Sequence, residues 1–155
     1  KFNIKNKVDV IKNINFIYNN EWQKYGNNII GISNGDKCGH SLGMNANGNR
    51  ILIGMPGYDN NKGIVRVYDY SNNTWNQIGQ DIIGSSNGDE CGYSTTIDKY
   101  GNVIAVGDPY YNDTGLVRLY EISNNILIQQ FNNITIANAT QIGINCNLMD
   151  KNFIS

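Results

Sequence analysis

Two acidic residues recur in the same six-residue loop and are the first candidates for chemistry. Asp36 stands in Asn-Gly-Asp-Lys-Cys-Gly, and Asp89 stands in Asn-Gly-Asp-Glu-Cys-Gly. An aspartate after Asn-Gly is typical of a turn, in which the carboxylate accepts hydrogen bonds from backbone N–H groups. The alternative is an exposed acid that binds a ligand, because such loops would recur on one face of a repeating structure. Both interpretations are consistent with the sequence.

A second group of polar and aromatic residues follows each of the two prolines, Pro56 and Pro109. Alternate connections of an antiparallel meander lie on the same side, so we expect this group to share a face with the Asn-Gly-Asp loops. Exposed tyrosines are common at recognition surfaces, and Tyr with Asp and Asn suits sugar hydroxyls. The alternative is that Tyr58 and Tyr111 pack between neighbouring units. The candidate binding residues are Asp36, Tyr58, Asp59, Asp89, Tyr110, Tyr111 and Asp113.

The sequence contains no recognisable catalytic or metal site. His40 is the only histidine, and no phosphate-binding loop, dinucleotide fingerprint or nucleophile elbow is present. The cysteines are odd in number and form no Cys-x-x-Cys pair, so a structural zinc site would need all of them together with His40. We therefore predict a chain that is not an enzyme and that uses no cofactor or metal. The three cysteines are Cys38, Cys91 and Cys146.

Composition excludes several classes of partner. The 155 residues carry a net charge of −1, without the basic excess that nucleic-acid or polybasic membrane binding would require. No apolar run approaches the roughly 20 residues needed to span a bilayer, so membrane insertion is not expected. The chain begins with Lys, which suggests a processed chain or a piece of a larger one. Abundant Asn, Ile, Lys and Tyr are typical of an AT-rich genome.

The candidate residues belong to an internal repeat. Trp22 opens W-Q-K-Y-G-N-N-I-I-G-I-S-N-G-D-K-C-G, and Trp75 opens W-N-Q-I-G-Q-D-I-I-G-S-S-N-G-D-E-C-G. The match continues to Gly63-Ile-Val-Arg-Val-Tyr68 and Gly115-Leu-Val-Arg-Leu-Tyr120, far beyond chance. We predict the end of a preceding unit over 1–21, whole units over 22–74 and 75–126, and a degenerate partial unit over 127–155. In the first of these stretches, Ile14-Asn-Phe-Ile-Tyr18 is similar to the third strand of a unit.

Each unit contains four short extended segments separated by Gly and Asn turns. In the second unit these are 93–97, 103–106, 116–120 and a segment that begins near Asn125, and no segment has helical periodicity. Strands of this length make antiparallel meanders. A repeat of about 50 residues with four strands is typical of a β-propeller blade, so we predict an all-β fold of about three blade equivalents. A β-solenoid and a β-sandwich are the alternatives.

Both units contain Cys-Gly followed by Gly-x-Pro: Cys38-Gly39 with Gly54-Met-Pro56, and Cys91-Gly92 with Gly107-Asp-Pro109. On these residues the repeat resembles the FG-GAP, integrin-α-like propeller repeat, in a form common in algae, protists and their large viruses. Cys stands where the family has Phe. FG-GAP repeats often carry calcium in the first hairpin, but residues 45–49 offer no carboxylate and residues 98–102 only one. The resemblance therefore implies a propeller that has lost or never had calcium.

Three blades do not close a ring, since propellers typically need four to eight. The predicted chain is therefore a partial propeller, or one completed by association with copies or other proteins. We expect a structural or assembly module acting through protein–protein contacts, in a virus particle or at an extracellular surface. The alternative is an adhesion or lectin-like module that binds glycans through its Tyr, Asp and Asn loops.

Overall fold

A computed structural model describes residues 24–135 and 141–148 of the chain. These residues form two four-stranded antiparallel sheets, so the prediction of an all-β fold is confirmed, and they close neither a barrel nor a ring. The first sheet contains β1 (Ser41–Met44), β2 (Arg50–Met55), β3 (Ile64–Ser71) and β4 (Thr74–Ile83), with the short turn α2 (Tyr58–Asn61) after β2. The second contains β5 (Ser94–Ile97), β6 (Val103–Asp108), β7 (Leu116–Ser123) and β8 (Ile126–Ile134), with the turn η1 (Tyr111–Asp113) after β6.

The third and fourth strands of each sheet are joined by a two-residue Asn-Asn hairpin. Asn72 and Asn73 have φ angles of 52° and 61°, and Asn124 and Asn125 have φ angles of 49° and 61°. Two consecutive left-handed residues suit a type I′ turn, whose twist matches that of the flanking strands. Asn tolerates this conformation better than other non-glycine residues, which explains why the same dipeptide occurs at both hairpins.

Each sheet has two faces, which we call front and back. The front of the first sheet carries Leu42, Met44, Ile51 and Ile53, and the front of the second carries their repeat counterparts Thr95, Ile97, Ile104 and Val106. The back faces carry the alternate residues, because successive side chains of a strand point to opposite sides.

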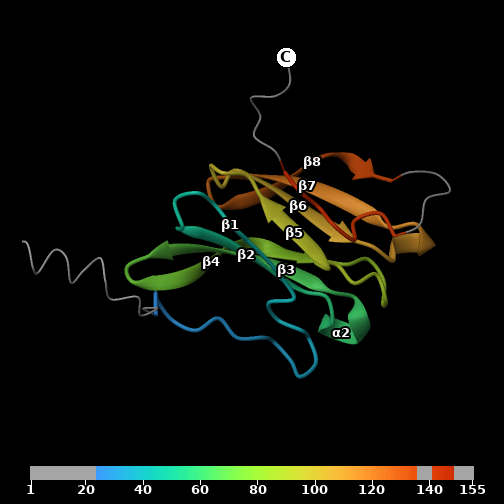
Figure 1. Cartoon of the computed structure of the whole chain (residues 1–155), viewed down its shortest axis with the longest axis horizontal. Helices are drawn as coiled ribbons and strands as arrows, with labels where there is room; N and C mark the ends of the chain where they lie inside the picture. The colour runs from blue at the N-terminus through green and yellow to red at the C-terminus, as the bar shows by residue number, and fades with distance from the viewer. Residues whose placement is uncertain (1–23, 136–140, 149–155) are drawn as a thin grey trace, which may run out of the picture.

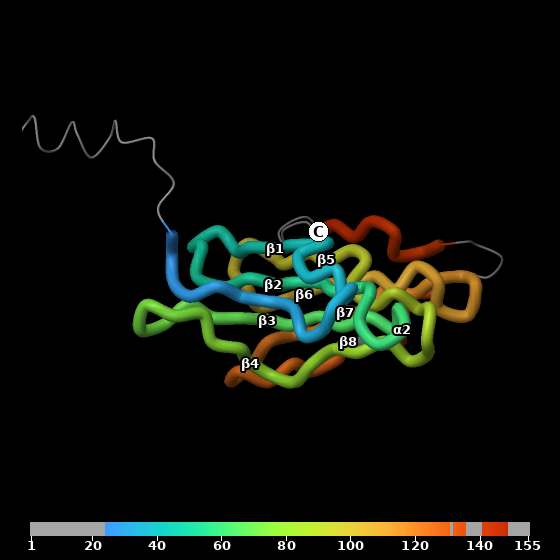
Figure 2. The backbone as a smooth tube through the Cα atoms, turned by 90° about the horizontal axis from the view of Figure 1, so that it is seen from below, coloured from blue at the N-terminus to red at the C-terminus, as the bar shows by residue number. Residues whose placement is uncertain are grey.

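The two sheets stack with the back of the first against the front of the second (Figures 1 and 2). Strand β5 contacts β1 and β2, and β8 contacts β4. Each sheet thus buries a different face in the same interface, so the contact is head-to-tail. The apolar cluster between the sheets comprises Leu52, Val65, Val67, Ile78 and Ile82 from the first sheet, Ile97, Ile104, Val106, Tyr120, Ile122 and Leu127 from the second, and Cys91.

The front of the first sheet is covered by the extended segment 24–38 (Figure 2). Ile29 and Cys38 pack against a cluster formed by Ile53, Met55, Ile64 and Tyr68. At the start of this segment, the Tyr25 and Tyr70 rings stack with centroids 3.9 Å apart. The segment therefore covers the middle of a face against which, among the described residues, no other sheet packs.

The sequence repeat is offset by one strand from the sheets. The predicted unit 75–126 begins inside β4 of the first sheet and ends at the first residue of β8. The unit 75–126 therefore crosses from the first sheet to the second, which ties the two sheets together. The preceding-unit strand predicted over 14–18 and the final residues of the third unit lie outside the described residues.

Candidate functional site

The candidate loops gather at one end of both sheets, which we call the loop end (residues 33–40, 56–63, 84–93 and 109–115). The Gly57 N–H donates to the carbonyl oxygen of Asp36 at 3.0 Å, and the Tyr110 N–H donates to that of Asp89 at 3.4 Å. The expected shared face is therefore confirmed. It arises because antiparallel pairing places the start of β1 beside the end of β2, and the start of β5 beside the end of β6.

Asp36 and Asp89 hold their own loops together. Both residues are buried, with 5% and 4% of their surface exposed. The Asp36 carboxylate accepts hydrogen bonds from the N–H groups of Ile32, Ser33 (3.1 Å) and Cys38 (2.9 Å). Burial alone would raise the pKa of Asp36, but the three amide donors outweigh it and the pKa is lowered.

The Asp89 carboxylate repeats this arrangement. Its Oδ2 accepts from the Ser85 N–H at 2.9 Å and from the Ser86 N–H at 2.7 Å. The turn-forming interpretation therefore describes both aspartates, and their carboxylates face inward to backbone amides. A ligand at the loop end would meet other side chains.

The loop after β2 has an unusual backbone. Asp59, Asn60 and Asn61 take φ angles of 47°, 55° and 59°, so three consecutive residues are left-handed. Their conformation turns carbonyl groups toward the next unit: Asn60 O accepts from the Gly88 N–H at 3.2 Å, and Asn61 O accepts from the Glu90 N–H at 2.8 Å. The strained loop is therefore a backbone contact between consecutive units.

The tyrosines of these loops differ in exposure. Tyr58 and Tyr111 are half-buried, and Tyr58 packs against the cluster on the front of the first sheet. Tyr110 is 40% exposed, while Asp59 and Asp113 are also exposed. Of the candidate binding residues, these three present their side chains at the surface of the loop end.

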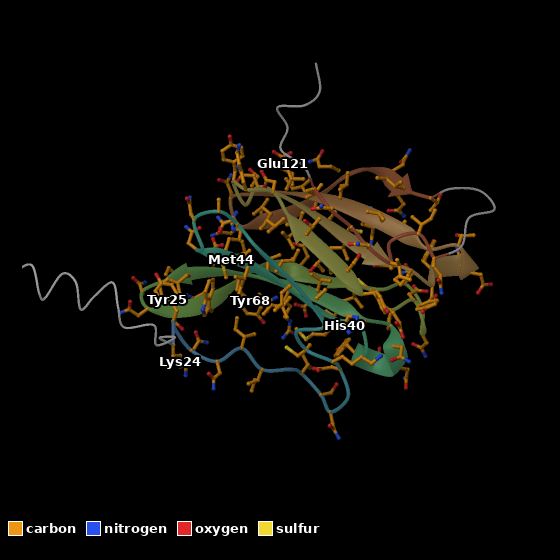
Figure 3. The ribbon with its side chains drawn as sticks, viewed as in Figure 1. Lys24, Tyr25, His40, Met44, Tyr68 and Glu121 are labelled. Carbon is orange, nitrogen blue, oxygen red and sulfur yellow. The ribbon has the colours of Figure 1, made fainter. Side chains whose placement is uncertain are left out.

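An aromatic row at the loop end was not predicted from the sequence. The rings of His40 and Tyr93 lie 4.7 Å apart, and those of Tyr93 and Tyr110 lie 6.4 Å apart in an edge-to-face arrangement. Figure 3 labels His40, which lies at the opposite end of β1 from Met44. The signal was present in the repeat, because His40 and Tyr93 occupy equivalent positions before the first strand of their sheets.

A buried polar cluster lies between the sheets. Asp108 is fully buried, and Arg118, which is 9% exposed, donates from Nη2 to its Oδ2. Arg118 also donates to Cys91 Sγ at 2.8 Å and to Ile83 O of the first sheet at 3.1 Å. Burial raises the pKa of Asp108 to about 6, although the Arg118 charge opposes this.

The equivalent arginine of the first unit has a different partner. Arg66 makes a two-pronged ion pair with Asp81, with both N–O distances at 2.9 Å. The counterpart of Asp81 is Asn133, and the counterpart of Asp108 is Met55. The partner carboxylate thus lies on the fourth strand in the first sheet and on the second strand in the second sheet. Only in the second sheet are the carboxylate and its arginine, Arg118, both buried.

The turns at the other end of the sheets use their polar side chains to hold the backbone. Asn45 Oδ1 accepts from the N–H groups of Asn49 (3.1 Å) and Arg50 (3.0 Å), and Asp98 Oδ1 accepts from that of Val103 at 2.8 Å. In the described part of the chain, no three His, Cys, Asp or Glu residues cluster as metal ligands would.

Comparisons with known proteins provide no assignment: known family models give no match to this chain, and neither do curated proteins. Among residues 24–135 and 141–148, no helix is long and apolar enough to cross a membrane.

Proposed function

We propose that this chain is a non-enzymatic assembly module that acts through protein–protein contacts made by the outer faces of its stacked sheets. The observation that carries the proposal is a difference in exposure at equivalent positions. Thr95 and Ile97, on the front of the second sheet, are 9% and 8% exposed because the first sheet covers them. Their counterparts Leu42 and Met44 are 66% and 62% exposed. An apolar face built for stacking is therefore open at the β1 edge.

The other end of the stack supports the same proposal. Residues 141–148 meet the second sheet as residues 90–97 meet the first: Ser41 Oγ donates to Gly92 O at 2.8 Å, and Ser94 Oγ donates to Gly143 O at 2.7 Å. Gln141 has a φ of 58°, close to the 53° of its counterpart Glu90. Residues 141–148 of the third unit thus lie against the back of the second sheet, which suits continuation of the stack.

The two sheets also favour the propeller interpretation. Consecutive four-stranded meanders that pack front to back are the arrangement of propeller blades. The FG-GAP-like residues lie at the contact between units, since a Cβ added to Gly54 would come within 2.2 Å of Gly92 O. We therefore interpret the chain as a partial FG-GAP-like propeller, continued by further units or by association with a protein partner or a second copy.

The proposal is tested by the association state of the chain. Sedimentation velocity from about 5 µM to about 500 µM should show concentration-dependent association. Replacing Leu42 and Met44 together by Glu should abolish it, because two charges would enter an apolar contact. Tyr100→Glu is the matched control, since Tyr100 is 59% exposed in the turn between β5 and β6 and belongs to no strand of either outer face. A chain that stays monomeric throughout, or an equal effect of the control, would contradict the proposal.

A further inference from the structure

The aromatic row of the loop end is distinct from the sheet face that the proposed function uses. Three rings follow one another across the junction between the two units: His40, Tyr93 and Tyr110. His40 and Tyr110 are exposed, while Tyr93 is half-buried between them. The exposed rings of His40 and Tyr110 thus lie on either side of the half-buried ring of Tyr93.

Charges beside the row neutralise one another. Lys37 and Glu90 occupy equivalent positions in their loops and approach to 4.0 Å across the unit junction. Asp36 and Asp89 are buried with their carboxylates bonded to backbone amides. The exposed carboxylates of Asp59 and Asp113 also lie at the loop end, so a negatively charged, phosphorylated ligand is disfavoured there.

From this combination we propose that the aromatic row binds the pyranose rings of a neutral carbohydrate. The C–H face of a sugar ring is slightly positive and packs on the negative face of an aromatic ring. Sugar hydroxyls also need polar partners, and the two Asn-Gly loops place the exposed residues Asn34 and Asn87 at this same end of the sheets. Tyr and His side chains add polar atoms at the edges of the rings.

The site differs from the one expected from the sequence. That expectation centred on Tyr58, Tyr111 and the loop aspartates, whereas the structure half-buries both tyrosines and turns Asp36 and Asp89 inward. Tyr110 alone is common to the expected site and to the aromatic row.

The experiment is saturation-transfer difference NMR of the whole chain with four neutral trisaccharides: maltotriose, cellotriose, mannotriose and chitotriose. At least one should receive saturation, with a dissociation constant on the order of 1 mM. Tyr110→Ala and His40→Ala should each weaken binding by about tenfold. Tyr100→Ala is the matched control, because Tyr100 is 59% exposed at the opposite end of the sheet, and it should leave binding unchanged. The variants change exposed side chains, and circular dichroism checks that each remains folded.

Three results would overturn the proposal. The first is no transfer to any of the four trisaccharides at about 10 mM. The second is a loss of binding in Tyr100→Ala as large as that in Tyr110→Ala. The third is binding of an anionic heparin tetrasaccharide alone that disappears in about 0.5 M NaCl, where screening removes surface charge attraction. The last outcome would identify a contact with Lys37 in place of ring stacking.

Discussion

Replacing Asp108 by Met is expected to destabilise the fold by about 3–5 kcal/mol, because it leaves the buried guanidinium of Arg118 without its counter-charge. Met is the residue that the first unit has at this position, Met55, so the change preserves the repeat pattern. Asp108 is fully buried and Arg118 is 9% exposed, so water cannot replace the lost carboxylate. The remaining partners of the guanidinium, Cys91 Sγ, Ile83 O and Tyr120 Oη, carry no formal charge.

Guanidinium denaturation at about pH 7.5 measures the effect as a change in the free energy of unfolding. The matched control is Asp81→Asn, which removes the carboxylate from the equivalent arginine, Arg66. That pair is partly exposed, with side-chain exposures of 28% for Asp81 and 23% for Arg66. Partly exposed pairs contribute about 1 kcal/mol or less, so the control should be several-fold milder.

A double variant separates the orphaned charge from lost packing. Asp108→Met combined with Arg118→Met should recover most of the stability, because an apolar replacement of a buried ion pair is often neutral or stabilising. If the double variant were as unstable as Asp108→Met, or if Asp81→Asn cost as much as Asp108→Met, the reasoning from a buried charge would be refuted.

Two further outcomes follow from other contacts of the fold. Asp36→Ala should destabilise the chain by about 1–3 kcal/mol by leaving three amides unbonded, whereas the exposed Asp59→Ala should change unfolding by at most about 0.5 kcal/mol. Gly107→Ala would place a Cβ 2.0 Å from Gly143 O and so weaken the contact between residues 141–148 and the second sheet. Faster amide hydrogen exchange is then expected at Ile142, whose N–H donates to Thr114 O. Unchanged exchange would contradict close packing of residues 141–148 against the sheet.

Local features of the fold were predictable because they depend on short-range backbone chemistry. The Asn72-Asn73 hairpin and the strand beginning at Val103 follow from turn residues and β-branched runs. The turn-forming role of Asp36 follows from the Asn-Gly that precedes it. The aromatic row was less accessible, because it joins side chains from two units and from two loops of the second.

Sequence by itself determined the all-β class, the repeating unit and the shared face of its loops. Tertiary structure decided what each repeated position does. Arg66 and Arg118 stand in the same motif, yet one is partly exposed and the other is buried. Met44 and Ile97 likewise occupy equivalent positions on the front faces of their sheets, yet only Ile97 is covered. The physical reason is that burial depends on what packs against a face: a whole sheet covers the front of the second sheet, and one extended segment covers the front of the first.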